Sequence, residues 1–212
     1  MEKANEHKEK ITLTDRFRQI FRGILNPIGR FLNGIGLTPN AMTILGLIGN
    51  TIGAVFLARG QMTIGGIIIL LVGPIDALDG TMARLRGMDS NFGAFVDSVT
   101  DRYSELVIFG GLLYYYATTG NTLGIILVYL AAAGSVLVSY IRARGQSLGW
   151  NTKVGILTRM ERYLVLAPTL ILSTLILNIE LWGILIIAIF ANITAFQRIF
   201  DVRRQAHQER KE

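Results

Sequence analysis

The chain has no cysteine, and its two histidines, His7 and His207, both lie in polar terminal segments. The absence of cysteine excludes disulfides and thiolate metal sites. Charged residues are also scarce, at 17% of 212 residues, whereas hydrophobic residues make up 51%. This balance excludes an ordinary soluble domain and favours an integral membrane protein. The N-terminus is charged and lacks an apolar core, so we expect no secretory signal peptide.

Apolar runs of nearly membrane-spanning length recur along the chain. They predict six transmembrane helices, near residues 39–59, 62–84, 91–117, 121–144, 160–178 and 181–201. Thr38 and Pro39 predict the cap and the first helical residue of the first span. The connections are short, which favours a compact antiparallel bundle. We therefore expect an all-α integral membrane protein with a six-helix domain at 38–204, between an N-terminal segment at 1–37 and a tail at 205–212.

Basic residues are distributed unevenly over this arrangement. All 21 Lys and Arg except Arg59 fall on one side of the six predicted spans. The positive-inside rule then places both termini on the cytoplasmic side of the cytoplasmic membrane. Residues 14–25 predict an amphipathic helix, ended by Pro27, that lies on the inner leaflet. Packing of this helix against the bundle is the alternative, and both can hold.

Acidic residues lie inside two of the apolar segments, at Asp76, Asp79, Asp97 and Asp101. A carboxylate at the bilayer centre costs roughly 2.5–3.5 kcal/mol, so four of them could cost on the order of 10 kcal/mol. That cost is comparable to the whole stability of an ordinary domain. A compensating charge is therefore expected at these positions.

The spacing of the aspartates indicates what compensates them. Asp76 and Asp79 are three residues apart and Asp97 and Asp101 are four apart, so each pair shares one face of a helix. Two facing pairs carry a formal charge of minus four, which two divalent cations would neutralise. Carboxylate oxygens favour Mg²⁺ or Mn²⁺ over zinc or copper. Magnesium fills its remaining positions with water and phosphate, so we infer a phosphate-ester substrate.

The aspartates and the residues around them also form an ordered motif: Asp76, Asp79, Gly80, Ala83, Arg84, then Gly93, Asp97 and Asp101. This motif resembles the signature of the CDP-alcohol phosphotransferase family. The resemblance implies transfer of a phosphatidyl group from CDP-diacylglycerol, or of the ether-lipid equivalent from a CDP-archaeol-type lipid, to an alcohol with release of CMP. It also implies a homodimer, whereas nothing indicates a nucleic-acid partner.

The same resemblance implies roles for individual residues. Asp76, Asp79, Asp97 and Asp101 would hold the metals, and Asp101 would also act as the general base. Gly80, Ala83, Arg84 and Gly93 would border the CDP-lipid, although small residues can equally serve tight helix packing. We assign Glu105, one turn beyond Asp101, a structural hydrogen bond. Gly49 and Gly53 are assigned to ordinary close helix packing.

A second basic set is expected to bind the phosphate of the acceptor: Arg142, Arg144, Arg159, Arg162 and Arg198. Arginine suits phosphate recognition, although topology alone also predicts basic residues on this side. The segments around these arginines resemble the phosphatidylinositol-phosphate synthase branch and its archaeal relatives, which implies inositol phosphate as the acceptor. Glycerol 3-phosphate is the alternative within the family. A divalent-cation transporter is the alternative of another class, because intramembrane acids also line cation pathways.

Overall fold

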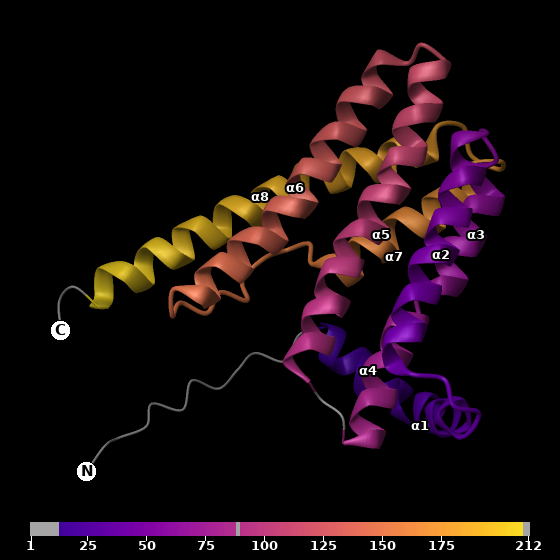
Figure 1. Ribbon diagram of the computed structural model, residues 1–212. Coiled ribbons are helices and arrows are strands. Elements are labelled where there is room, and N and C mark those ends of the chain that lie inside the picture. Colours follow the sequence, from indigo (N-terminus) through magenta and orange to yellow (C-terminus); the bar gives the residue numbers. More distant parts are fainter. Residues whose placement is uncertain (1–12, 88–89, 210–212) are drawn as a thin grey trace.

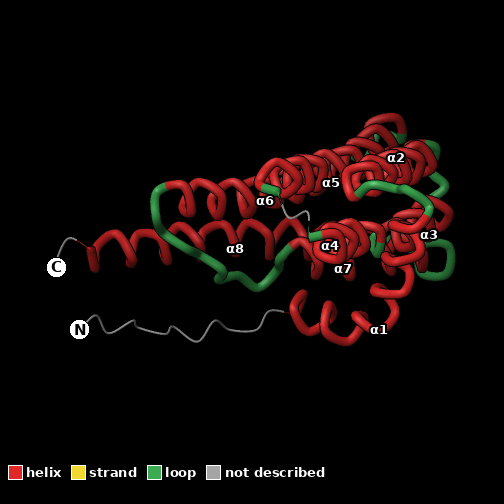
Figure 2. The backbone as a smooth tube through the Cα atoms, turned by 60° about the horizontal axis from the view of Figure 1, so that its bottom comes forward, coloured by secondary structure: helices red, strands yellow, loops and turns green. Residues whose placement is uncertain are grey.

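The computed structural model describes residues 13–87 and 90–209, without the side chains at 13–22, 24 and 76. The regular structure of this part of the chain is helical throughout (Figure 2). The helices are α1 (Leu13–Gly34), α2 (Pro39–Ala58), α3 (Met62–Val72), α4 (Ile75–Arg86), α5 (Asn91–Thr118), α6 (Thr122–Ser147), α7 (Arg159–Leu172) and α8 (Ile179–Glu209).

Four stretches of the described chain are long and apolar enough to cross a membrane: Pro39–Ala58, Met62–Arg86, Thr122–Ser147 and Ile179–Glu209. Large apolar side chains such as Leu71 and Trp182 are exposed on their outer faces, at 71% and 62%. Exposed apolar surface of this extent is typical of contact with lipid. The prediction of an all-α, multi-pass membrane protein is therefore confirmed.

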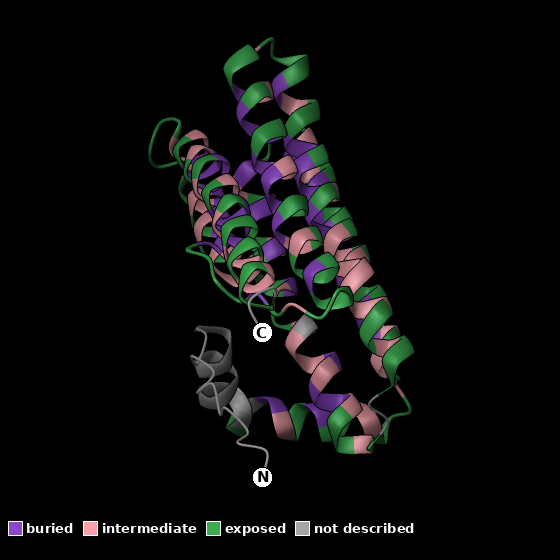
Figure 3. Cartoon of the chain, turned by 90° about the vertical axis from the view of Figure 1, so that its left-hand side faces the viewer, coloured by how far each residue is buried: buried purple, intermediate pink, exposed green. Residues whose placement is uncertain are grey.

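The helices pack through their facing sides. α5 lies between α2 and α6, α6 runs along α8, and α7 contacts α3 and α8 (Figure 1). Buried residues gather where helices face one another and exposed residues cover the outside (Figure 3). The core includes the fully buried side chains of Leu57, Ile69, Leu112, Leu170 and Ile187. This packed region supports one end of the bundle, whereas α1 and α4 lie together at the other end.

Several local predictions are confirmed. Thr38 caps α2, with its hydroxyl accepting a hydrogen bond from the amide of Ala41 at 3.2 Å, and Pro39 is the first helical residue. Gly49 and Gly53 pack closely on α3: a Cβ at Gly49 would lie 2.5 Å from Val72 Cγ2. These glycines therefore serve helix packing within the chain, as expected.

The structure differs from the prediction at two prolines. The span predicted at 62–84 is divided at Gly73–Pro74 into α3 and α4, because the proline ring clashes with the preceding turn and removes an amide donor. Pro27, in contrast, does not end the first helix, which continues to Gly34. The carbonyl that loses its donor there belongs to Gly23, which is exposed and can be hydrated.

The last two helices also end at positions other than those predicted. α7 ends at Leu172 instead of residue 178, and the hydroxyl of Ser173 donates to the carbonyl of Leu170 at 2.8 Å, as serine does where it competes with helix hydrogen bonds. α8 continues to Glu209, so most of the predicted tail at 205–212 is helical. Gln205 donates to Asp201 one turn earlier, at 3.0 Å, which supports this extension.

The helix that carries the first two aspartates, α4, is held by α1. Arg86 donates to the carbonyls of Leu37 at 2.6 Å and Asn33 at 3.3 Å, and Asn33 donates to the carbonyl of Met82 at 3.3 Å. After Arg86 the helix ends in Gly87, which adopts a left-handed conformation with φ of 61°. The first helix and the residues after it therefore fix the C-terminal end of α4, about two turns beyond Asp79.

Candidate active site

One large cavity, of about 2070 Å³, lies between α2, α4, α5, α6, α7 and α8. It brings together most of the predicted site residues: Asp79, Gly80, Ala83, Arg84, Gly93, Asp97, Asp101, Arg142, Arg159, Arg162 and Arg198. Arg144 does not line it. Asp76 lies in α4, one turn before Asp79, and its side chain is outside the described part. The two predicted groups, acidic and basic, thus border a single space.

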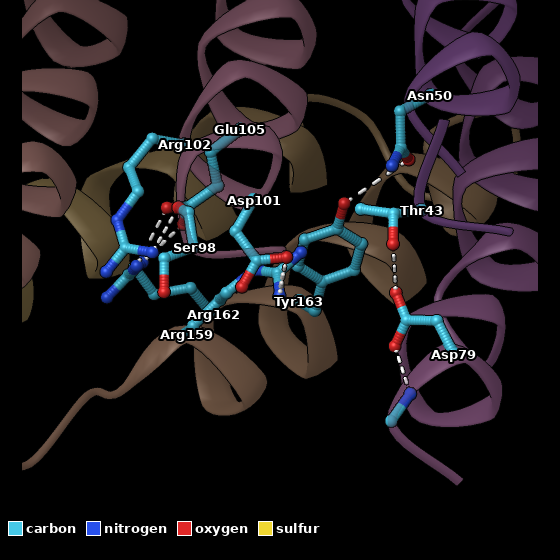
Figure 4. Close-up of polar contacts among 11 residues, drawn as sticks. Thr43, Asn50, Asp79, Ser98, Asp101, Arg102, Glu105, Arg159, Arg162 and Tyr163 are labelled. Atoms are coloured by element: carbon cyan, nitrogen blue, oxygen red, sulfur yellow. Dashed lines mark hydrogen bonds and ion pairs between the residues drawn. The ribbon is translucent and has the colours of Figure 1, made fainter. Parts of the chain in front are cut away.

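Asp79 is buried, with 4% of its surface exposed. One carboxylate oxygen accepts a hydrogen bond from the hydroxyl of Thr43 in α2 at 2.7 Å, and the other from the amide of Gly80 at 2.5 Å (Figure 4). Contacts of this kind orient a carboxylate for a bound cation. Thr43 was not predicted, and the only signal for it is a hydroxyl in a predominantly apolar span.

The acids of α5 form a ladder along one face of the helix. Asp97 and Asp101 are half-buried and line the cavity. Asp101 Oδ1 lies 2.5 Å from Nη1 of Arg159 in α7. Glu105, one turn after Asp101 on α5, binds Arg162, which also lies in α7 (Figure 4). The structural hydrogen bond expected of Glu105 is therefore confirmed, with an arginine as its donor.

The ligand chemistry of these acids suits a hard divalent cation. Asp79, Asp97 and Asp101 offer only carboxylate oxygens, from two helices that border one cavity, which fits Mg²⁺ or Mn²⁺. No three acidic or histidine side chains among those described converge on one point. The predicted set includes Asp76, whose side chain is not among them.

The arginines that border the cavity have different surroundings. Arg142 is exposed, and the side chain of Arg159 is 28% exposed and lies over the ring of Tyr163, 5.6 Å from its centroid. Arg198 is 3% exposed and donates to the carbonyls of Val154 at 2.9 Å and Val138 at 2.6 Å. Arg142 and Arg159 can therefore meet a ligand directly, whereas Arg198 ties α8 to α6 and to the loop before α7.

The small residues of the motif leave space beside the acids. A Cβ at Gly80 would have only Arg84 Nη1 within 4 Å, at 3.6 Å. At Gly93 it would lie 3.1 Å from Ser90 Oγ and 3.9 Å from Asn40 Oδ1. Neither glycine is therefore required by contact with a neighbouring backbone, unlike Gly65 in α3, where a Cβ would lie 3.0 Å from the carbonyl oxygen of Gly53.

Comparison with known proteins agrees with this geometry. A model of the CDP-alcohol phosphatidyltransferase family matches residues 36–196, which include the acidic motif and the cavity-lining arginines of α4 to α7, whereas Arg198 lies just beyond the matched range. The chain belongs to the CDP-alcohol phosphatidyltransferase family. The resemblance inferred from the motif is thereby confirmed, and membership of this enzyme family decides against the cation-transporter alternative.

Relatives within the family are similar in sequence to this chain over most of their length. The chain is 36% identical to phosphatidylinositol phosphate synthase of Streptomyces avermitilis, covering 93% of this chain and 85% of the relative. It is 34% identical to archaetidylinositol phosphate synthase of Pyrococcus horikoshii, covering 85% and 92%.

Solved structures of a family member show the same fold. The crystal structure of Mycobacterium tuberculosis phosphatidylinositol phosphate synthase with CDP-DAG bound matches with a TM-score of 0.79 at 32% identity, covering 85% of this chain and 94% of that one. The structure of the same enzyme in complex with manganese and citrate also matches with a TM-score of 0.79, covering 84% and 88%.

Proposed function

We propose that this phosphatidyltransferase is a phosphatidylinositol phosphate synthase: it transfers the phosphatidyl group, or its ether-lipid equivalent, from a CDP-linked lipid to a hydroxyl of inositol phosphate and releases CMP. The observation that carries the proposal is the single cavity lined both by the aspartates of the motif and by the arginines of α6, α7 and α8. The relatives from Streptomyces and Pyrococcus support the choice of acceptor, because one is named phosphatidylinositol phosphate synthase and the other archaetidylinositol phosphate synthase.

The acids are proposed to hold two divalent cations, Mg²⁺ or Mn²⁺. The ligands would be Asp76, Asp79, Asp97 and Asp101, with Asp79 oriented by Thr43. When bound, the cations would neutralise charge on the pyrophosphate and on the departing CMP. The manganese-containing structure of the mycobacterial relative supports this proposal. Gly80, Ala83, Arg84 and Gly93 would border the nucleotide, since Gly80 leaves open space beside the acids.

The chemical step transfers the phosphatidyl group by substitution at its phosphorus. The acceptor hydroxyl oxygen forms a bond to the lipid-linked phosphorus, the bond from that phosphorus to CMP breaks, and the hydroxyl proton goes to Asp101. Arg159 supports this role of Asp101, because its Nη1 lies 2.5 Å from the aspartate. An acceptor phosphate bound at Arg159 would therefore hold the rest of the acceptor next to the base, which is the positioning that general base catalysis requires.

The acceptor phosphate is proposed to bind at the arginines around α7. Arg142 and Arg159 are accessible from the cavity and would contact it directly. Arg198 and Arg162 border the same cavity but are buried, so they would act from behind these two. Arg144, predicted with the others, hydrogen-bonds Ser147 at 3.3 Å and is outside the cavity lining.

We also propose six membrane crossings, by α2, α3 with α4, α5, α6, α7 and α8. α5 has 28 residues and is about 42 Å long, enough to cross even though its first half carries acids. α7 has 14 residues, about 21 Å, so residues 173–178 would complete its crossing. α1 would lie on the inner leaflet of the cytoplasmic membrane, with both termini and the cavity mouth in the cytoplasm.

The homodimer remains a prediction, to be checked by light scattering of the purified protein.

An acceptor screen tests the proposed function. The purified protein would be incubated with CDP-diacylglycerol and Mg²⁺, and CMP would be followed with inositol phosphate, glycerol 3-phosphate, serine or free inositol. We expect release with inositol phosphate and little with free inositol, which lacks the phosphate that the arginines bind. Release with glycerol 3-phosphate alone would make the protein a phosphatidylglycerol-phosphate synthase. Repeating the screen with a CDP-archaeol-type donor distinguishes ester from ether lipids.

A further inference from the structure

The inner contact between α5 and α7 is a buried, two-point ion pair. Glu105 Oε1 accepts from Nε of Arg162 at 2.7 Å, and Oε2 accepts from Nη2 at 2.9 Å. The remaining guanidinium nitrogen, Nη1, donates to the carbonyl of Leu157 at 3.2 Å. Arg162 is 2% exposed and Glu105 6%. Every guanidinium nitrogen of Arg162 therefore already donates to a protein oxygen.

This occupancy separates Arg162 from the arginines that can meet a ligand. Arg159, one turn earlier, is exposed over 28% of its side chain, whereas binding a phosphate at Arg162 would require breaking a buried pair. Breaking such a pair is costly, because it leaves an uncompensated charge inside the protein. The geometry thus favours an indirect role for Arg162 in acceptor binding.

We propose that Glu105 and Arg162 are a positioning pair that sets the register of α7 on α5 and thereby holds Arg159 at the acceptor phosphate. The inference rests on the proposed function; it adds Glu105 and gives Arg162 a defined role, and neither residue touches the substrate. It is based on two acids one turn apart that face two arginines one turn apart. Asp101 and Glu105 are four residues apart on α5, and Arg159 and Arg162 are three residues apart on α7. The two ion pairs form successive rungs between the helices (Figure 4).

The two ion pairs differ in how readily a ligand can displace the aspartate or glutamate from its arginine. The Asp101–Arg159 rung faces the cavity, where a phosphate can compete for the arginine. The Glu105–Arg162 rung is enclosed, and its two parallel hydrogen bonds define one relative position of the helices. A slip of α7 by one residue would turn Arg159 by about 100° around its helix, away from α5. Apolar side chains would fill the same volume without defining this register.

A second contact on the same turn of α7 supports this reading. Tyr163, whose ring lies under Arg159, donates through its hydroxyl to Asn50 Oδ1 in α2 at 3.2 Å. Asn50 is fully buried. The first turn of α7 is thus held from α5 by Glu105 and from α2 by Asn50, and Arg159 lies between these two attachments.

A double-mutant cycle tests the pair against a direct role for Arg162. We would measure acceptor KM, donor KM and kcat for Glu105→Gln, Arg162→Gln and the double variant. We expect each single variant to raise acceptor KM about tenfold with donor KM changed less than about twofold, and the double variant to be no worse than either single one. If Arg162 bound the phosphate itself, Glu105→Gln would leave acceptor KM unchanged or lower it. That outcome, or a double variant whose effect is the product of the single effects, overturns the proposal.

The matched control is Glu180→Gln. Glu180 is also a buried glutamate, at 9% exposure, but it lies at the start of α8 and does not line the cavity. We expect its acceptor KM to equal that of the unaltered protein. If Glu105→Gln does not fold, as judged by its thermal midpoint in detergent, Glu105→Asp replaces it. The shorter acid weakens the pair without removing its charge, and an unchanged acceptor KM in that variant would again contradict the proposal.

A distance measurement tests the register without relying on activity. The chain has no cysteine, so spin labels can be attached at Tyr114→Cys in α5 and Leu172→Cys in α7, both exposed positions outside the cavity lining. We expect a narrow distance distribution that shifts or broadens when Glu105→Gln is added. An unaltered distribution would overturn the positioning role. An enzyme inactive with every acceptor would instead contradict the proposed function, and the distance would still decide whether the pair sets the register.

Discussion

The two ends of α5 carry glycines with opposite surroundings. A Cβ at Gly111 would overlap the carbonyl oxygen of Ala54, in the backbone of α2. At the other end, a Cβ at Gly93 would meet only the side chains of Ser90 and Asn40. The first glycine lets two helices touch, and the second borders the cavity. Glycines that look alike in the sequence therefore allow close helix packing at one end of the bundle and leave space at the cavity at the other.

The side chains of α5 follow the same division. Ile108 and Leu112 are almost fully buried in the apolar core, whereas Asp97, Asp101 and Glu105 face the cavity or its floor. Acids in this environment are costly to bury, so they need partners in a fixed place. The packed end of the bundle provides that fixed frame, which suggests that damage at the two ends should be separable by experiment.

The largest effect is expected at the cavity end, from Asp101→Asn. Asparagine has nearly the same shape but cannot accept the hydroxyl proton, so we expect kcat to fall by about 100-fold or more with much of the donor binding retained. CMP release and binding of the CDP-lipid would measure the two effects. Asp201→Asn in α8, outside the cavity lining, is the control. Turnover of Asp101→Asn at the normal rate would remove Asp101 as the base.

Gly111→Ala should damage the packed end instead. The added methyl would push against the α2 backbone, and overpacking of this kind costs about 1–3 kcal/mol. We expect a lower thermal midpoint in detergent. Gly110→Ala is a closely matched control, because a Cβ there would have nothing within 4 Å. If both variants unfold at the same temperature, the contact between Gly111 and Ala54 does not limit packing.

Gly80→Ala tests the cavity end separately, because we expect stability to stay the same or rise while donor binding becomes weaker. Alanine favours a helix by about 1 kcal/mol over glycine, and its methyl would meet only Nη1 of Arg84, at 3.6 Å, so stability should be unchanged or higher. The methyl would enter the space proposed for the nucleotide, so we expect donor KM to rise about tenfold. Loss of stability with normal donor KM would assign Gly80 to packing.

Local chemistry explains which features could be predicted from the sequence. The start of α2 was predicted because Thr38 and Pro39 act within one helical turn. The grouping of Asp97 with Asp101 was predicted because helical spacing alone determines it. The break at Pro74 was missed, since average hydropathy passes smoothly through a proline. Hydropathy also does not show where the end of α8 lies, because its last residues are polar and still helical.

Partners that are distant in the chain could not be predicted in this way. Spacing on α5 placed Glu105 on the acidic face, but its partner Arg162 is 57 residues away and was grouped with the phosphate ligands because of its charge. Thr43 was missed for the same reason, since its contact with Asp79 spans 36 residues. Such contacts depend on how helices pack, which a single sequence does not specify.

The smallest effect is expected from Arg144→Ala, compared with Arg142→Ala two residues earlier on α6. Both arginines are exposed, but only Arg142 lines the cavity. Loss of a charged hydrogen bond to the acceptor phosphate would raise acceptor KM about tenfold in Arg142→Ala. Arg144→Ala should change it by less than about twofold, because an exposed surface charge contributes little. Equal increases in acceptor KM in the two variants would mean that both arginines act through the general positive potential of this surface. The cavity boundary would then not separate arginines that bind the acceptor from those that serve topology.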